Sequence, residues 1–184
     1  QLVKANTDVD KADPRGLTAL MLAAQNGHGA PIEQLVKANA DVDKADPRGV
    51  TALMLAALNG HGAAIDQLMK ANAGVDKADS LDYTALMLAA LNGHGAVIEQ
   101  LVKANADVNK SSLPGFTALM LAAQSGHGAA IEQLLKANAD VDKSGLPGVT
   151  ARKLAEQGGH SAVVNLLQGR ATANARERTS PSGP

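Results

Sequence analysis

A period of 33 residues runs through almost all of this 184-residue chain. Each period carries one Thr-Ala step and one Gly-His step. The threonines are Thr18, Thr51, Thr84, Thr117 and Thr150, and the histidines are His28, His61, His94, His127 and His160. Repeats at this spacing predict a stacked solenoid. Such a fold offers an extended modular surface rather than a deep catalytic pocket.

The copies are nearly identical. Residues 13–45 and 46–78 differ at only six positions. This uniformity indicates recent duplication or deliberate design, and the sequence is compatible with both.

The composition supports a stack of small helices and excludes several kinds of chemistry. The chain is 45% hydrophobic but has one Phe, one Tyr and no Trp, and closely packed Ala-rich helices need no large aromatic core. A net charge of −1 argues against a nucleic-acid-binding face. The lack of cysteine removes thiolate metal sites and cysteine nucleophiles. No run of 18 uncharged apolar residues and no signal peptide are visible, so we expect an intracellular protein without a membrane partner.

The repeat at residues 46–78 shows how each unit should fold. Thr51 is an N-cap residue before a helix-forming run that Gly60 ends. A second helix is predicted from Ala63 to Ala71. Asn72 then stands where a left-handed residue is expected. Two such short helices must bury their apolar faces against the next copy.

These residues resemble the ankyrin repeat. Residues 49–57 read Gly-Val-Thr-Ala-Leu-Met-Leu-Ala-Ala, and the family pattern is Gly-x-Thr-Pro-Leu-His-Leu-Ala-Ala, followed by Gly-His and a Gly-Ala-Asp-Val-Asn ending. The resemblance covers residues 1 to about 168. It implies an all-α ankyrin-repeat solenoid of helix-turn-helix units joined by β-turn or hairpin-like loops. It also implies a concave groove where partners bind.

The chain departs from that pattern consistently. Ala replaces the family's Pro, Met replaces its His and Asn replaces its Gly. These residues are Ala19, Ala52, Ala85, Ala118 and Ala151; Met21, Met54, Met87 and Met120; and Asn39, Asn72, Asn105 and Asn138. We expect the Met change to replace a polar link between repeats with apolar packing.

The period also divides the chain. Residues 1–12 are a truncated repeat, residues 13–168 form the array, and residues 169–184 are expected to be a disordered tail. The units are 13–45, 46–78, 79–111, 112–144 and 145–168. The last is expected to be a C-terminal cap because Arg152, Lys153 and Glu156 are charged. Ser180 and Pro181 suggest either a phosphorylation site or a solvated tail. The uncapped start, with Leu2 and Val3, predicts fraying or self-association.

Three recurring patterns could suggest an active or metal site, and none satisfies the chemistry. The histidines occur once per repeat, so they cannot surround one zinc ion, and we expect each to bond local turn backbone. The paired carboxylates lack the rest of a calcium loop; they are Asp8/Asp10, Asp41/Asp43 and Asp140/Asp142. The Gly-x-Gly steps lack the third glycine and preceding strand of a dinucleotide loop. We therefore expect no enzyme activity, no cofactor and no metal.

Positions where the repeats differ are the candidates for partner binding. They lie at the turn tips and at the end of each first helix: Arg15, Leu17, Arg48, Val50, Leu58, Leu81, Tyr83, Leu91, Leu113 and Phe116. Tyr83 and Phe116 occupy equivalent places in adjacent repeats. Aromatic and Arg side chains are common interface anchors. The alternative is that these side chains fold back over turn backbone.

Two functional hypotheses follow. The first is a non-catalytic module that binds a protein or peptide. The second is a designed or self-assembling scaffold without a natural partner. The variable tips favour the first hypothesis, whereas the uniform helices and the uncapped start favour the second.

Overall fold

The computed structural model describes residues 8–179, with side chains for residues 8–172. These residues form ten α-helices in five pairs. They are α1 (Ala19–Gln25), α2 (Gly29–Lys37), α3 (Ala52–Leu58), α4 (Gly62–Lys70), α5 (Ala85–Leu91), α6 (Gly95–Lys103), α7 (Ala118–Gln124), α8 (Gly128–Lys136), α9 (Ala151–Gln157) and α10 (Ser161–Thr179). The predicted all-α repeat solenoid is confirmed.

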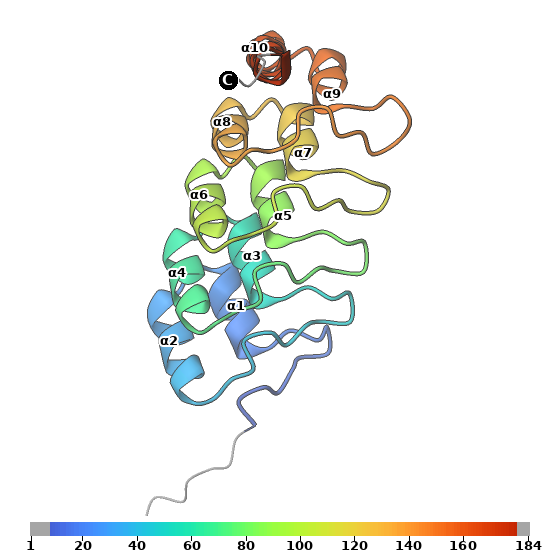
Figure 1. The fold of residues 1–184 in the computed structure, drawn as a ribbon. Helices are drawn as coiled ribbons and strands as arrows, with labels where there is room; N and C mark the ends of the chain where they lie inside the picture. Colours follow the sequence, from blue (N-terminus) through green and yellow to red (C-terminus); the bar gives the residue numbers. More distant parts are fainter. Residues whose placement is uncertain (1–7, 180–184) are drawn as a thin grey trace, which may run out of the picture.

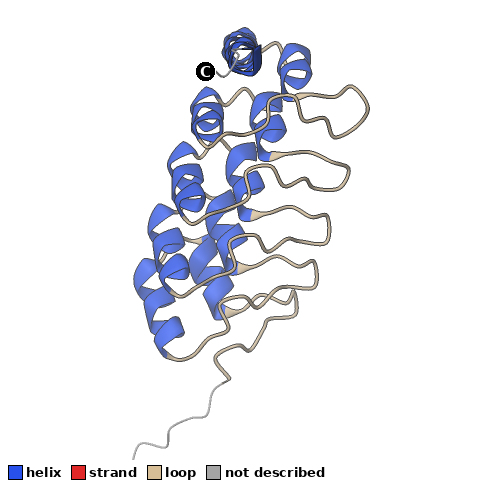
Figure 2. Cartoon of the chain, viewed as in Figure 1, coloured by secondary structure: helices blue, strands red, loops and turns tan. Residues whose placement is uncertain are grey.

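The helices stand in two parallel rows. The odd-numbered helices form one row and the even-numbered helices the other, and long loops project beside the odd-numbered row (Figure 1). Figure 2 shows these loops as hairpin-like excursions without extended strands in the described part of the chain. Each of four loops is closed by one antiparallel bridge: Ala45 with Thr51, Ala78 with Thr84, Ser111 with Thr117 and Ser144 with Thr150.

The helix boundaries follow from local chemistry. Thr18 precedes α1 in an extended conformation, and its hydroxyl accepts a hydrogen bond from the Met21 amide at 3.2 Å. The other four odd-numbered helices begin with the same threonine cap. After the second helix of each of the first four repeats, an asparagine adopts a positive φ of 60–64°. The left-handed asparagine predicted at residue 72 is therefore present, with a φ of 60°.

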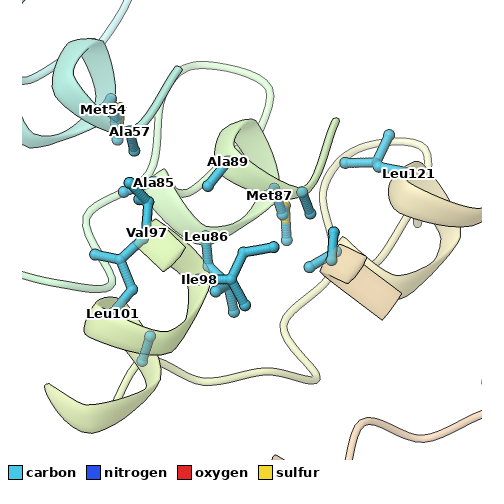
Figure 3. Close-up of a cluster of buried hydrophobic side chains, with 14 of the residues drawn as sticks. Met54, Ala57, Ala85, Leu86, Met87, Ala89, Val97, Ile98, Leu101 and Leu121 are labelled. Carbon is cyan, nitrogen blue, oxygen red and sulfur yellow. The ribbon is translucent and has the colours of Figure 1, made fainter. Parts of the chain in front are cut away.

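The core is continuous through the stack. Methionine at the position of the family's histidine is fully enclosed, as Met54 and Met87 show (Figure 3). Alanines such as Ala57 and Ala90 have no exposed surface, which lets neighbouring helices approach closely. The stack thus relies on apolar packing at the positions where the sequence predicts it.

The histidines link consecutive repeats, so the prediction of a local turn bond was wrong. The Nε2 atom of His94 lies 3.1 Å from the carbonyl oxygen of Leu58, in the preceding repeat. His61, His127 and His160 make the same contact with residues 36 positions earlier. The ring also lies against a glycine of that repeat: a Cβ added to Gly60 would come within 2.7 Å of the His94 Nδ1 atom. Only the stacking of two repeats brings these groups together.

The paired carboxylates have a similar structural role. The Asp10 carboxylate accepts the amide hydrogen of Asp41 at 3.0 Å, and the Lys44 ammonium donates to the Asp10 carbonyl at 2.8 Å. Asp76 and Lys110 repeat this arrangement two interfaces later. These acids bridge the extended segments between repeats, so they are more than residues flanking one turn.

The C-terminal segment differs from the expectation of disorder after residue 168. Helix α10 continues through Thr179. Its first turns are anchored because Val163 and Leu167 are buried, and α10 packs on α9 and α8. Once a helix is nucleated by packing, Ala- and Arg-rich sequence extends it readily. The predictions for residues 1–7 and 180–184, including Leu2, Val3, Ser180 and Pro181, lie outside the described residues.

Candidate partner-binding surface

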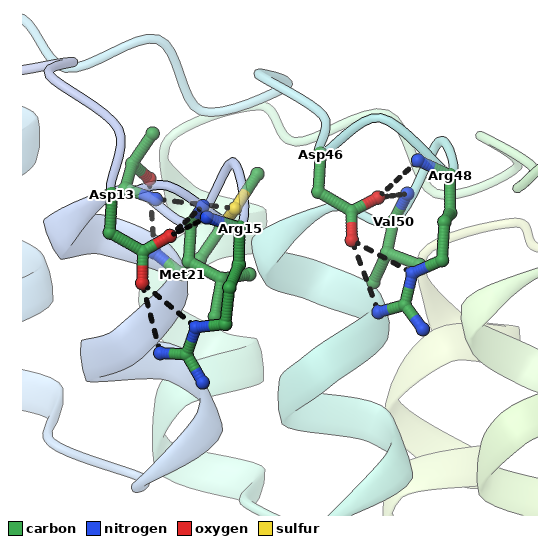
Figure 4. A network of polar contacts seen from close by, with 8 residues as sticks. Asp13, Arg15, Met21, Asp46, Arg48 and Val50 are labelled. Carbon is green, nitrogen blue, oxygen red and sulfur yellow. Dashed lines mark hydrogen bonds and ion pairs between the residues drawn. The ribbon is translucent and has the colours of Figure 1, made fainter.

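The first two turn tips are braced by an aspartate and an arginine. In the second tip, Asp46 accepts the amide hydrogens of Arg48 and Val50 at 2.8 and 2.9 Å. Its other carboxylate oxygen accepts hydrogen bonds from Nε and Nη2 of Arg48 at 3.2 and 3.1 Å. Asp13 and Arg15 form the same arrangement in the first tip (Figure 4). One carboxylate therefore fixes both the turn backbone and the direction of the guanidinium.

These contacts also set the charge at the tips. Hydrogen bonding from the Leu17 amide, helped by Arg15, lowers the pKa of Asp13. Burial by itself would raise the pKa of Asp46, but the Val50 and Arg48 amides and the Arg48 guanidinium outweigh it, and the pKa is lowered. Both carboxylates therefore stay ionised at neutral pH. The arginine side chains are 72% and 74% exposed, whereas the Asp46 side chain is only 2% exposed.

The third tip keeps the aspartate that holds the turn backbone, but it carries Leu81 where the first two tips carry arginine. Asp79 accepts the amide hydrogens of Leu81 and Tyr83 at 2.9 and 2.8 Å. Asp82 adopts a φ of 59°, in the left-handed region that Gly49 occupies at the same place in the second tip. The third tip therefore differs from the first two in its side chains, whereas its backbone stays left-handed at the same place.

Each of the last three tips carries one exposed leucine. Leu81 is 55% exposed, Leu113 58% and Leu146 45%. The tips are joined through their backbones, because the Ser80 amide donates to the Arg48 carbonyl at 2.7 Å and the Leu113 amide to the Leu81 carbonyl at 2.9 Å. Sequence reasoning omitted Leu146, although it lies one period after Leu113 and the repeat itself could have identified it.

The remaining candidates are less exposed. Tyr83 and Phe116 are half-buried and pack against the core, as do Leu17 and Val50 at the same position of the first two tips. Leu58 and Leu91 are half-buried at the ends of α3 and α5. The structure thus brings Arg15 and Arg48 together at one end of the row of tips and places Leu81 and Leu113 further along it. The two aromatic rings form the inner wall of the tips rather than their outer edge.

Other parts of the described structure offer no competing centre. Among those residues, His, Asp and Glu side chains do not gather into a group of three that could hold a metal ion. A mainly apolar groove lies between α8 and α10, lined by Leu135, Leu166 and Gly169 among others, and it is on the helical side away from the tips (Figure 1). No helix within residues 8–179 combines the length and apolar content needed to cross a bilayer.

Comparison with known families agrees with this architecture. A family model of ankyrin repeats matches residues 1–79, 29–112, 64–145 and 86–179, which together cover nearly the whole chain. The chain belongs to the ankyrin-repeat family. Ankyrin repeats are generally protein–protein interaction modules, and the family is generally non-catalytic. The chain matches no curated protein.

Proposed function

We propose that this ankyrin array is a non-catalytic module that holds a protein or peptide partner along its turn tips and the adjoining concave face. The observation that carries the proposal is the row of exposed leucines on adjacent tips, Leu81, Leu113 and Leu146. Exposed apolar side chains that gather along one edge, rather than singly, are typical of interaction sites.

The neighbouring helix ends suit the same purpose. Leu58 and Leu91 lie half-buried there beside uncharged amides, and the Asn92 side chain donates to the Leu58 carbonyl at 2.8 Å. A partner seated on this surface would desolvate few charges, which favours binding. Tyr83 and Phe116 would then support the outer leucines from beneath.

The test compares captured proteins between variants. The double variant Leu81→Ser/Leu113→Ser should lose a partner that the unmodified chain retains. Leu166→Ser is the control, because Leu166 is a half-buried leucine on α10, away from the tips and from α1. Circular dichroism checks that each variant folds. Equal capture by all three chains would contradict the assignment to the tips.

One observation favours self-association as a second function. Ala19 and Leu22 on α1 are exposed, whereas their equivalents Ala52 and Leu55 are buried by the preceding repeat. The other end of the array presents charges such as Arg152, which do not suit head-to-tail stacking. We propose that two such α1 faces pair. Sedimentation equilibrium should show a dimer that Leu22→Glu disrupts, and a monomer at all concentrations would refute the pairing.

A further inference from the structure

The five tips form one edge whose chemistry changes along its length. At the same position of successive repeats stand Arg15, Arg48 and then Leu81. The last two tips carry exposed leucines, Leu113 and Leu146. Backbone hydrogen bonds join the second tip to the third and the third tip to the fourth. The edge therefore runs from cationic to apolar.

The arginines are held in a form that suits anion binding. Asp46 engages Nε and Nη2 of Arg48, and Asp13 engages the same two atoms of Arg15. In Figure 4 the remaining nitrogen of each guanidinium points away from its aspartate, and the two groups are oriented alike. A guanidinium fixed in this way loses little side-chain entropy when it binds a second carboxylate. Because Asp46 is buried beneath the exposed Arg48, the outer charge of that tip is positive.

We propose that the partner is an extended peptide segment with acidic side chains opposite Arg15 and Arg48 and apolar side chains opposite Leu81, Leu113 and Leu146. This inference rests on the proposed function and adds the chemistry of the partner. Neighbouring repeats lie about 10 Å apart, and a peptide in the polyproline II conformation advances about 3.1 Å per residue with three residues per turn. Because every third side chain of such a peptide points the same way, one partner side chain would meet each tip.

Asp82 sets the boundary between the two halves. Its exposed carboxylate lies beside Leu81 on the third tip. A partner acid placed there would be repelled, so the acidic residues must end before the third tip. A polyproline II segment of about 13 residues would span the edge, with two acids three residues apart followed by three apolar residues at the same spacing.

The experiment is a selection from a displayed library of random peptides of about 13 residues, with the full chain as the target. We expect enriched peptides with acidic residues at one end and apolar residues at the other, both at three-residue spacing. Binding of an enriched peptide to the variants is then measured by fluorescence anisotropy. Arg15→Gln/Arg48→Gln should weaken it about tenfold, and about 0.5 M salt should remove that difference. The matched control is Arg152→Gln, an exposed arginine on α9 that should leave binding unchanged.

The outcomes separate the two proposals. Enriched peptides that bind the Arg15→Gln/Arg48→Gln variant as tightly as the unmodified chain, but not Leu81→Ser/Leu113→Ser, would overturn the acidic–apolar partner and leave the tips as a binding surface. Enriched peptides that bind both double variants as tightly as the unmodified chain would refute the assignment of the tips as the binding surface. A selection that enriches no peptide would count against both this partner and the proposed peptide-binding function.

Discussion

The contact between glycine and histidine of successive repeats predicts a large and specific penalty for one added methyl group. In Gly126→Ala, the new Cβ would meet Nδ1 of His160 at 2.6 Å and Cε1 at 2.7 Å. The ring cannot simply turn aside, because its Nε2 atom lies 3.1 Å from the Gln124 carbonyl oxygen and that contact would be lost. The substitution therefore tests whether the histidine position holds two repeats together.

The change in the free energy of unfolding has four contributions. A positive φ of 75° disfavours alanine by about 1–2 kcal/mol, and the stiffer unfolded chain offsets about 0.4–1 kcal/mol. Overpacking adds about 1–3 kcal/mol, and the lost hydrogen bond adds about 1 kcal/mol. We expect Gly126→Ala to lower the free energy of unfolding by about 4 kcal/mol.

Gly159 provides a matched control inside the same molecule. It has nearly the same φ, 72°, but no atom lies within 4 Å of an added Cβ because no further repeat covers it. Gly159→Ala should therefore cost only the backbone contribution, about 1 kcal/mol. Both glycines lie near the C-terminal end of the array, so differences in local unfolding between repeats affect them similarly.

Guanidinium denaturation with circular dichroism measures these differences. Adding His160→Ala to Gly126→Ala should relieve the clash, so the double variant should be about 1–2 kcal/mol more stable than the sum of the two single effects. Equal losses for Gly126→Ala and Gly159→Ala would show that the ring contact contributes nothing. Purely additive effects of Gly126→Ala and His160→Ala would refute the reasoning as well.

Three further predictions concern the tips and the core. Asp82→Gly should raise the free energy of unfolding by about 0.5–1 kcal/mol, since glycine accepts a φ of 59° without strain, and an unchanged or lower denaturation midpoint would contradict it. Because the pKa of Asp46 is lowered, the stability that its carboxylate gives the fold is complete above about pH 4 and is lost as the pH falls below that value. Asp46→Ser should therefore make the melting temperature less sensitive to acid. Equal acid sensitivity of the variant and the unmodified chain would argue against a stabilising role for this carboxylate. Ala56 has no exposed surface, so Ala56→Leu should destabilise the stack by about 1–3 kcal/mol while leaving m in denaturation unchanged.

Local structure could be predicted from the sequence because its causes are local. The threonine before each first helix and the asparagine after the second helix act on their own turn. The structure has the helix at Ala52–Leu58 and a left-handed Asn72, as expected. The fold class followed from the period, because each short helix pair needs its neighbour for burial.

Contacts between repeats were harder to predict because they depend on how the copies are stacked. His94 reaches the Leu58 carbonyl 36 residues earlier, and the Asp10 carboxylate reaches the Asp41 amide 31 residues later. Neither separation equals the period, so alignment of equivalent residues does not reveal the pair. The continuation of α10 beyond residue 168 was not predicted for a related reason: it is supported by anchoring at Val163 and Leu167 rather than by its own apolar pattern.

The candidate site was only partly predictable, because the aspartate that holds the turn and the outer side chain of the tip change independently from repeat to repeat. At this equivalent position of the five tips, the first three carry Asp13, Asp46 and Asp79, the fourth carries Ser112 and the fifth carries Gly145. The carboxylates hold arginine or backbone amides in the first three tips, and the exposed leucines Leu81, Leu113 and Leu146 begin where the arginine is lost.

The histidine contacts, by contrast, recur with the same 3.1 Å distance from Nε2 to a backbone carbonyl oxygen at the four interfaces between the five helix pairs. The tips can therefore change their surface chemistry one by one without altering how the repeats stack. This separation explains why a chain with nearly identical helices can still present a directional edge: the outer residues of the tips change from arginine to leucine, while each histidine keeps its contact with a backbone carbonyl of the preceding repeat.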